Sequence, residues 1–531
     1  VGTASNSITD EINTLSGEIE EVFKARLPGL DTDARIAQWI QSNGLDRQKG
    51  FLTKISKLVA FSIILKLLIV EYLRQTSESS YVKLSELADL NTISEQVNKE
   101  VGLELFPSSP LDQLVKTLPS CLRPSMEKIR EFAESVRADR ENIGAIYNSI
   151  VTQEERRRMG QFWTPDYIAD FMVDWVIRTP QDKVFEPGTG PATFLIRAIR
   201  RLEELGQNKE EMHNNLFGVE LAFIPYLMGT ANLLSHLPKA KGNIAYRDFL
   251  LMGSQNDLYP KTSLGRYLFP SRVFLFDAIV FNPPYTRHHL LPSIYKNSLL
   301  PAFKRRFGVR VSRLSSLFVY FIFHALSFLE KEGRMAFITP TIVFESRTSD
   351  SLKDFLIKNA DIKAIVSFAD EINLFPGVDA AACITLLQKS LPKSAEVVLM
   401  EITKWPGKEQ IIKALDSTVE GQQEWGSVRK ISTAELVSNK NWTTLIRSGQ
   451  LIESPKFVKL GELAHVVRGI ATGANDFFTL TDEEVVKEGL ERSLLKPVLT
   501  KTRYVQGYVF DSEDFTRLGE EGKKRWLLYC T

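Results

Sequence analysis

An apolar segment, Phe276 to Phe281, runs directly into the residues Asn282-Pro283-Pro284-Tyr285. The side-chain oxygen of Asn282 and the carbonyl of Pro283 are both hydrogen-bond acceptors, and the following proline holds the turn extended. Two acceptors at one amino group can draw its lone pair out of conjugation with an aromatic ring, and the ring of Tyr285 offers a surface on which a flipped base can stack. The motif predicts chemistry on an exocyclic amino group, although four residues alone also fit a strand that ends in a Pro-Pro turn.

Acids and glycines follow three other short apolar segments. The motifs at the ends of these segments are Glu186-Pro187-Gly188-Thr189-Gly190, Gly218-Val219-Glu220 and Asp248-Phe249. Glycines let the backbone turn tightly and approach a ligand, and the chain has no GxGxxG or phosphate-loop lysine at this point. An acid before the glycines would repel a pyrophosphate but could pair with the cation of an amino acid. Each acid alone also fits a strand-end cap, whereas the three in this order predict a site for a nucleoside that carries an amino acid.

The elements that must position these residues form an α/β fold. Residues 1–148 show helical periodicity throughout and predict an all-helical N-terminal domain. Residues 149–445 alternate short apolar runs with amphipathic helices, which predicts a seven-stranded, doubly wound, Rossmann-like sheet. The helix predicted over Ser315 to Lys331 is apolar nearly all round, so we expect it to be buried against that sheet. The seven strands are expected near residues 183–185, 216–219, 244–246, 276–281, 335–339, 362–368 and 382–387.

Composition narrows the class of protein. The chain has 531 residues, 44% hydrophobic and 25% charged, which is ordinary for a globular protein of several domains. Its three cysteines lie far apart and form no CxxC pair, so we expect neither a disulfide framework nor a metal site. The longest apolar stretch, Leu58 to Val70, is too short to cross a bilayer. We therefore expect no membrane association and a reduced, cytoplasmic location.

The distribution of charge indicates a nucleic-acid partner, although the net charge is only +1. Between Asp277 and Glu330 there is no acidic residue. The same interval contains a series of basic residues beside the Asn-Pro-Pro-Tyr turn, and such a positive field suits a phosphate backbone. A solvated loop is the plainer interpretation of this interval. The basic residues of this interval are Arg287, His288, His289, Lys296, Lys304, Arg305, Arg306, Arg310 and Arg313.

The motifs resemble, in type and order, those of the gamma-class DNA adenine-N6 methyltransferases of restriction-modification systems, over residues 150 to 390. Gln161-Phe162-Trp163-Thr164-Pro165 before the sheet is part of the resemblance. It implies the cofactor S-adenosyl-L-methionine, a prokaryotic host and double-stranded DNA as substrate. Thr164, Pro165 and Glu186 with Pro187, Gly188 and Gly190 would then hold the methionine end, Glu220 the ribose, and Asp248 and Phe249 the adenine. Asn282, Pro283, Pro284 and Tyr285 would be catalytic. Glu186 and Thr189 depart from the commoner Asp-Pro-Ala-Cys form of the glycine motif.

Residues 446–531 resemble the opening of a target-recognition domain fused to type II enzymes of this class. The resemblance rests on Arg468-Gly-Ile-Ala-Thr472-Gly-Ala-Asn475. It implies DNA contacts from Arg468, Thr472 and Asn475, besides those expected from Arg287, His288, Arg305 and Arg306. Fewer than 80 residues follow Lys459, so we expect a truncated recognition domain. The helical N-terminal region is also similar to that of type I modification subunits, which leave recognition to a separate specificity subunit.

Three alternatives remain at this point. Asn-Pro-Pro-Tyr also serves enzymes that methylate amino groups in RNA or glutamine in proteins. The chain could instead be the methylating part of a fused or multi-subunit restriction endonuclease, with the nuclease on a partner, since no convincing nuclease motif occurs in the sequence. The third alternative is a non-catalytic DNA-binding subunit, but a scaffolding role alone would not require the intact Asn-Pro-Pro-Tyr turn.

Overall fold

The computed structural model places the chain in two compact units, Val1–Gln450 and Leu451–Thr531. The N-terminal helices share the first unit with the large sheet. The structure describes residues 3–30, 50–74, 90, 92–119, 122–138, 142–158, 160–252, 275–286, 288, 291–369, 372, 374–375, 381–390, 395–416, 419–439, 441–447, 458, 460–465, 472, 474–501, 504–505, 507 and 509–529.

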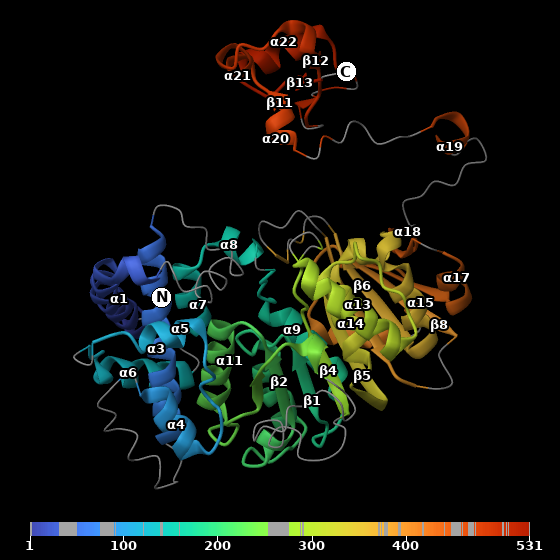
Figure 1. Ribbon diagram of the computed structural model, residues 1–531. Coiled ribbons are helices and arrows are strands. Elements are labelled where there is room, and N and C mark those ends of the chain that lie inside the picture. The colour runs from blue at the N-terminus through green and yellow to red at the C-terminus, as the bar shows by residue number, and fades with distance from the viewer. Residues whose placement is uncertain are drawn as a thin grey trace. The chain divides into compact units, whose positions relative to one another are not determined.

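The N-terminal region is helical in its described residues, as the sequence predicts. In α1, apolar residues recur every three or four positions and are buried, from Ile8 through Leu15 to Phe23. Helix α3 is buried along nearly its whole length, and it packs between α1 and α11 (Figure 1). The helices are α1 (Thr3–Leu30), α3 (Phe51–Arg74), α4 (Ile93–Val101), α5 (Pro110–Val115), α6 (Met126–Arg137), α7 (Ile143–Ile150) and α8 (Gln153–Arg158).

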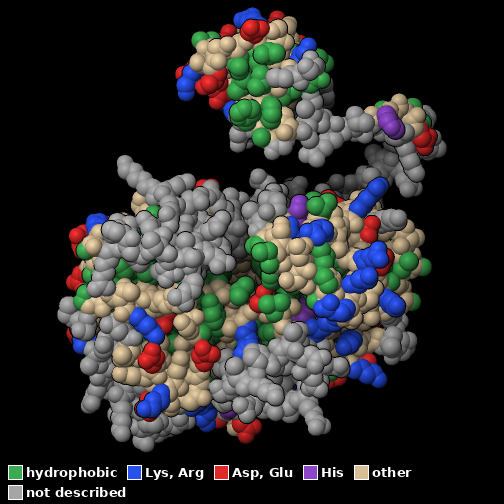
Figure 2. All heavy atoms as spheres, in the orientation of Figure 1, with side chains coloured by type: hydrophobic (Ala, Val, Ile, Leu, Met, Phe, Trp, Pro, Cys, Tyr) green, Lys and Arg blue, Asp and Glu red, His purple; other side chains and the backbone are tan. Residues whose placement is uncertain are grey.

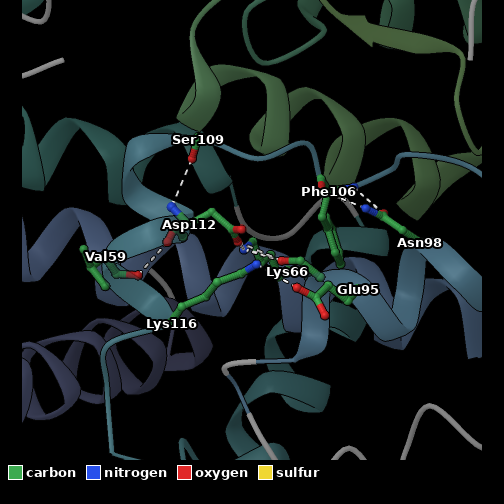
Figure 3. A network of polar contacts seen from close by, with 10 residues as sticks. Val59, Lys66, Glu95, Asn98, Phe106, Ser109, Asp112 and Lys116 are labelled. Carbon is green, nitrogen blue, oxygen red and sulfur yellow. Dashed lines mark hydrogen bonds and ion pairs between the residues drawn. The ribbon is translucent and has the colours of Figure 1, made fainter. Parts of the chain in front are cut away.

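A buried charged network joins these helices (Figure 3). The ammonium of Lys66 on α3 is fully buried and forms an ion pair with Asp112 on α5. Ser94 on α4 accepts from the same ammonium at 2.8 Å and donates to Asp112 at 2.8 Å. The ammonium also lies 5.8 Å from the ring centroid of Phe223, which begins α11 beside the sheet. Burial lowers the pKa of Lys66, while Asp112 opposes that shift.

The large sheet contains all seven predicted strands, but the predicted count of seven is wrong, since ten strands of the described part of the chain form the sheet. Their order is β3-β2-β1-β4-β5-β7-β6-β8-β10-β9. The run from β3 to β5 is parallel, whereas β7 is antiparallel to both β5 and β6. The strands are β1 (Val184–Pro187), β2 (Leu216–Glu220), β3 (Ile244–Tyr246), β4 (Phe276–Phe281), β5 (Leu329–Pro340), β6 (Asp361–Phe368), β7 (Ala382–Gln388), β8 (Glu396–Ile402), β9 (Gly421–Gln423) and β10 (Gly426–Ser432).

Two hydrophobic cores lie on the two faces of this sheet. The core on one face contains α9, α10, α11 and α16 together with the N-terminal helices. The other contains α13, α14, α15, α17 and α18. The sheet is therefore covered on both faces, which keeps its strands dry and apolar. The helices are α9 (Asp166–Val176), α10 (Thr193–Glu204), α11 (Phe223–His236), α13 (Ser293–Phe307), α14 (Leu317–Leu326), α15 (Asp350–Asn359), α16 (Lys408–Asp416), α17 (Thr433–Ser438) and α18 (Trp442–Arg447).

The predicted helix over Ser315 to Lys331 is too long. Helix α14 ends at Leu326, and β5 already begins at Leu329, where it pairs with Phe276. Glu332 takes a left-handed φ of 63°, and the pairing register shifts between Phe276 and Ala278. The apolar run of α14 is buried on all sides and continues through Phe328 and Leu329 into β5, so it has no distinctive period that marks the change from helix to strand.

The second unit has its own small sheet, with the order β11-β13-β12 and antiparallel pairing. Capping boxes start α21, at Thr481 and Glu484, and α22, at Asp511 and Asp514. Within the described residues, no helix of the chain is long and apolar enough to span a bilayer. The elements are α19 (Leu460–Leu463), α20 (Asn475–Phe478), β11 (Thr479–Leu480), α21 (Asp482–Lys487), β12 (Leu495–Pro497), α22 (Ser512–Glu520) and β13 (Trp526–Leu528).

Candidate active site

The carboxyl ends of β1, β2, β3 and β4 meet at one edge of the sheet, because these strands are parallel neighbours. Open α/β sheets bind ligands at this edge. The structure thus brings together the four motifs that lie far apart in the sequence: the glycine-rich turn after Glu186, the acids Glu220 and Asp248, and the turn that begins at Asn282.

The glycine-rich turn links β1, which ends at Pro187, to α10. Gly188 and Gly190 take left-handed φ values of 71° and 54°, which side chains with a Cβ rarely adopt. A Cβ at Gly188 would lie 4.0 Å from the Cδ of Pro284, so this turn is a close neighbour of the Asn-Pro-Pro-Tyr turn. A Cβ at Gly190 would lie 3.5 Å from the ring of Trp163.

Glu186 directs its carboxylate at the start of α10. Its two oxygens accept from the backbone N–H groups of Phe194, at 3.3 Å, and Leu195, at 3.0 Å. A carboxylate stabilises the positive end of a helix in this position. Glu186 is 2% exposed, and burial raises its pKa well above the usual range, helped by the nearby charge of Glu220. The side chain therefore holds the helix that follows the glycines, in addition to the cofactor contact predicted for it.

Glu220 ties the glycine-rich turn to the end of β2. One carboxylate oxygen accepts from the N–H of Gly190 at 2.8 Å, and the other accepts from the N–H of Ala222 at 2.7 Å. Burial raises its pKa, and these backbone donors oppose the shift. A carboxylate oxygen has a second lone pair, so Glu220 keeps acceptor capacity for hydroxyl groups.

Asp248 and Phe249 follow β3, and their side chains make different kinds of contact. Asp248 accepts from the N–H of Leu250 at 2.9 Å through Oδ1 and from the hydroxyl of Tyr295 on α13 at 2.8 Å through Oδ2. Burial raises the pKa of Asp248. Phe249 is buried, and its ring packs 5.1 Å from Phe321 and 4.6 Å from His324, between centroids. Phe249 therefore forms part of the aromatic core beneath this end of the sheet.

The amide of Asn282 is oriented by two acceptors from the segment before the sheet. Its Nδ2 donates to the carbonyl of Phe162 at 3.0 Å and to the hydroxyl of Thr164 at 3.2 Å. A carbonyl can only accept, so the amino side of the amide must face Phe162. The Oδ1 atom is buried and has no hydrogen-bond partner among the described residues. Buried acceptors are rarely left unpaired, so this oxygen marks a place for a donor from outside the described residues.

Residues 160–165 form the support for this turn. The carbonyl of Gly160 accepts from the N–H of Tyr285 at 3.4 Å, and a Cβ at Gly160 would lie 2.8 Å from the hydroxyl of Thr286. Gly160 has a φ of 71°, so both its conformation and its surroundings require glycine. Thr164 is buried, and Pro165 then precedes α9 with a φ of −56° that suits the entry to a helix.

Aromatic rings surround Tyr285. Its ring centroid lies 5.0 Å from that of Phe162, 5.9 Å from that of Phe375 and 6.4 Å from that of Phe318. Burial raises the pKa of Tyr285 well above the usual range, so the phenol stays neutral. Phe375 was not singled out in the sequence, because the residues between β6 and β7 show no motif and only the fold brings it to Tyr285. These rings form an aromatic cage of Phe162, Tyr285, Phe318 and Phe375.

Helix α7 of the N-terminal region also reaches the site. The indole N–H of Trp163 donates to Asn148 at 2.9 Å, and the hydroxyl of Tyr147 donates to Gln161 at 3.0 Å. Both contacts fix residues beside Phe162, whose carbonyl anchors Asn282. No motif in the sequence predicts this link, because Asn148 and Tyr147 lie in the region predicted as a separate helical domain.

The residues predicted to bind DNA are distributed differently. Arg287 and Arg468 lie outside the described residues. Arg305 is exposed on the last turn of α13, and basic side chains gather on the side of the first unit that carries α13, α14 and α15 (Figure 2). His288 is partly buried and lies just before α13, with its carbonyl 2.8 Å from the ammonium of Lys296. In the second unit, Thr472 donates to Asn475 at 2.6 Å.

Arg306 points inward, unlike Arg305. Its guanidinium donates to the carbonyl of Met252 at 3.1 Å, to Nδ1 of His324 at 3.2 Å and to the hydroxyl of Ser327 at 3.1 Å. The reason is helical spacing, since Arg306 shares the buried face of α13 with Leu299 and Phe303. Burial and Arg306 lower the pKa of His324, which keeps that imidazole neutral and able to accept.

Two protein-family models match the chain. The model described as N-6 DNA Methylase matches residues 138–419, which include every residue of the first-unit site described above. The model described as the C-terminal domain of the type II methyltransferase M.Eco57I matches residues 433–531.

Individual proteins are similar over much of the chain. The type II methyltransferase M.AccI of Acinetobacter calcoaceticus is 22% identical over 393 residues, which are 73% of this chain and 65% of that protein. M.HindII of Haemophilus influenzae is 21% identical over 366 residues, 67% of this chain and 62% of its own length. The chain thus spans less than two thirds of these relatives. Among solved structures, a cryo-electron microscopy structure of the DrdV–DNA complex aligns with a TM-score of 0.53 at 13% identity, over 99% of this chain and 58% of that one, which shows a shared fold.

Proposed function

The chain belongs to the N-6 DNA methylase family, and from this we propose that it transfers the methyl group of S-adenosylmethionine to the N6 amino group of adenine in double-stranded DNA. The activity would be the modification function of a restriction-modification system, because M.AccI and M.HindII, which are similar in sequence, are type II methyltransferases. The observation that carries the proposal is the buried Oδ1 of Asn282, an acceptor without a partner among the described residues.

The strand ends fit S-adenosylmethionine in chemical type. Three carboxylates, from Glu186, Glu220 and Asp248, lie at the ends of three adjacent strands. This acidic set suits a nucleoside with hydroxyl groups and an ammonium group, and it would repel a dinucleotide pyrophosphate. The two left-handed glycines leave the backbone of the turn open to a ligand. Bound S-adenosylmethionine supplies an electrophilic methyl group on a sulfonium.

The chain's own residues prepare the nucleophile. Asn282 Oδ1 accepts one hydrogen of the adenine amino group, and the carbonyl of Pro283 accepts the other. These two bonds weaken conjugation of the nitrogen lone pair with the ring and stabilise the positive charge that develops on nitrogen. Because the Asn282 amide is already fixed by Phe162 and Thr164, it does not have to reorganise at the moment of reaction.

The aromatic cage supports an extruded base. Taking a base out of the duplex costs a few kcal/mol, and stacking on an aromatic ring returns about 1–3 kcal/mol. Tyr285 is the ring next to Asn282 in the chain, and Phe375 and Phe162 lie within 6 Å of it, between centroids. Exposed basic side chains such as Arg305 would contact phosphate, and the second unit would contribute target recognition.

The test is incubation of the chain with methyl-labelled S-adenosylmethionine and unmethylated bacterial DNA, followed by digestion and identification of the labelled nucleoside. Label in N6-methyladenine supports the proposal. Parallel incubations replace the DNA with RNA or with protein. Label only in RNA, or only in glutamine of a protein, would change the proposed substrate class while keeping the amino-group chemistry.

The variant Asn282→Ala removes the unpartnered oxygen. We expect methylation to fall at least about a hundredfold, since one preorganised polar group at a developing charge is worth that much, and binding of S-adenosylhomocysteine to stay within about twofold. The matched control is Asn359→Ala, because the Asn359 amide lies on an exposed helix end and donates to Phe355 at 2.8 Å. Methylation by Asn282→Ala equal to that of the control would refute the assignment.

A further inference from the structure

Tyr295 links the first turn of α13 to the acid at the end of β3. Its hydroxyl is 2.8 Å from Oδ2 of Asp248, and no sequence motif pointed to it. The tyrosine comes from the element after the Asn-Pro-Pro-Tyr turn, whereas Asp248 follows a strand three positions away in the sheet. Only the fold joins the two residues.

The contact fixes the orientation of a carboxylate that would otherwise be free to turn. The terminal torsion of an aspartate is broad, so one hydrogen bond leaves the second oxygen mobile. Here Oδ1 accepts from the N–H of Leu250 and Oδ2 accepts from Tyr295, which holds both oxygens. An ionised carboxylate has about four lone-pair sites. Acceptor capacity therefore remains on an oriented group.

The contact also favours the charged form of that carboxylate. Asp248 is largely buried, and desolvation raises its pKa, whereas the donor hydroxyl of Tyr295 and the N–H of Leu250 both lower it. Tyr295 remains a neutral donor, because burial and the charge of Asp248 raise its own pKa. A neutral phenol can only donate to a carboxylate, so the direction of the bond is fixed.

We propose that Tyr295 is a positioning residue for the purine of the cofactor: its hydroxyl holds Asp248 so that the carboxylate accepts from the exocyclic amino group of the adenine. The inference rests on the proposed function, because it concerns the same cofactor site. It makes the Tyr295 and Asp248 pair a specificity device. A purine with an oxo group in place of the amino group would present an acceptor to a fixed acceptor, and such a pair is unfavourable.

The experiment compares two ligands on the full chain without DNA. Isothermal titration calorimetry measures the binding of S-adenosylhomocysteine and of S-inosylhomocysteine, which has an oxo group where adenine has its amino group. For the unchanged protein we expect S-adenosylhomocysteine to bind more tightly. In Tyr295→Phe, we expect its dissociation constant to rise about tenfold, the usual effect of losing one hydrogen bond to a charged group. The dissociation constant of S-inosylhomocysteine should change less than twofold.

Two control variants separate positioning from folding. Tyr320→Phe removes a hydroxyl that donates to the Ser312 carbonyl at 3.3 Å and should leave both dissociation constants unchanged. In an Asp248→Ala background, Tyr295→Phe should have no further effect, because its partner is absent.

Other results would overturn the inference. Equal weakening of both ligands in Tyr295→Phe would mean that the residue only supports the fold. Unchanged or tighter binding of S-adenosylhomocysteine would mean that the hydroxyl does not help Asp248 to accept. These outcomes are distinct from failure of the proposed function, which would show as no binding of S-adenosylhomocysteine to the unchanged protein.

Discussion

Asn282 owes its orientation to atoms that the chain supplies from a separate segment. The motif itself was readable in the sequence, and so were the acids at the strand ends. The partners of these residues were not. Phe162 and Thr164 hold Asn282, Tyr295 holds Asp248, and Phe375 packs near Tyr285 through tertiary contacts. A motif records which groups react, whereas the groups that orient them are recorded only in the packing.

Thr164 gives a test of that orientation. Thr164→Val keeps the shape of the side chain but removes the oxygen 3.2 Å from Asn282 Nδ2. We expect kcat for methylation to fall about tenfold, because an unpaired amide N–H costs about 1–3 kcal/mol and the Phe162 carbonyl still holds the amide. The KM for DNA should stay within about twofold. Thr164→Ser should restore kcat; a Val variant as fast as the unchanged protein would contradict the role.

At the scale of elements, the apolar periods located the strands that carry the site but not the rest of the sheet. The seven strands lie where the sequence placed them, to within a few residues at most ends. β8, β9 and β10 were missed, because loop signals at Trp405-Pro406-Gly407 and Gly421 dominate that region. The antiparallel strand β7 cannot be told from a parallel one by its apolar run. The predicted helix extends beyond α14 into β5, because an apolar run that is buried on all sides has no distinctive period.

The ends of β1, β2 and β3 predict a pH dependence of stability. Burial raises the pKa values of Glu186, Glu220 and Asp248. A raised pKa means that the folded chain keeps protons that the unfolded chain has released. These acids therefore stabilise the fold below about pH 4, where unfolded carboxyl groups are protonated, and this contribution is lost as the pH rises through their raised folded pKa values.

Glu186→Gln tests this dependence. Urea unfolding of the ligand-free chain between pH 4 and pH 8, a range set by the ordinary carboxyl pKa of about 4, should show the unchanged protein losing stability relative to the variant as the pH rises. The exposed Glu211→Gln serves as the matched control and should show no such trend. A constant difference between Glu186→Gln and the unchanged protein across this range would refute the argument.

At the scale of the whole molecule, the N-terminal helices and the sheet pack together. Their apolar residues form a continuous core that runs from Ile8 to Val428, and both belong to the same compact unit. The sequence predicts a separate helical domain, because the hydrophobic periodicity changes after the N-terminal helices. Such a change marks a change of element type and does not show how much surface the elements bury together. α7 even supplies contacts to the segment that orients Asn282.

The buried pair Lys66 and Asp112 tests how far the N-terminal helices depend on their buried charges. Lys66→Met should lower the unfolding free energy of the first unit by about 3–5 kcal/mol, because it leaves Asp112 buried without its counter-ion. Asp112→Leu should have a similar effect. The double variant should be more stable than the sum of the two losses predicts, since no unpaired charge remains. Urea unfolding followed by circular dichroism gives all four values, and strictly additive losses would show that the pair is not coupled.

The division into two compact units also bears on how such a protein can evolve. All the residues proposed for chemistry lie in the first unit, whereas the second has its own sheet and its own buried residues, Leu480, Leu495, Leu518 and Leu527. Mutations within the core of the second unit therefore change none of the residues proposed for chemistry and none of the buried residues in the cores of the first unit. With the second unit proposed for target recognition, selection could alter that unit while the residues proposed for chemistry stay constant, and a lineage could acquire new specificities without losing the reaction.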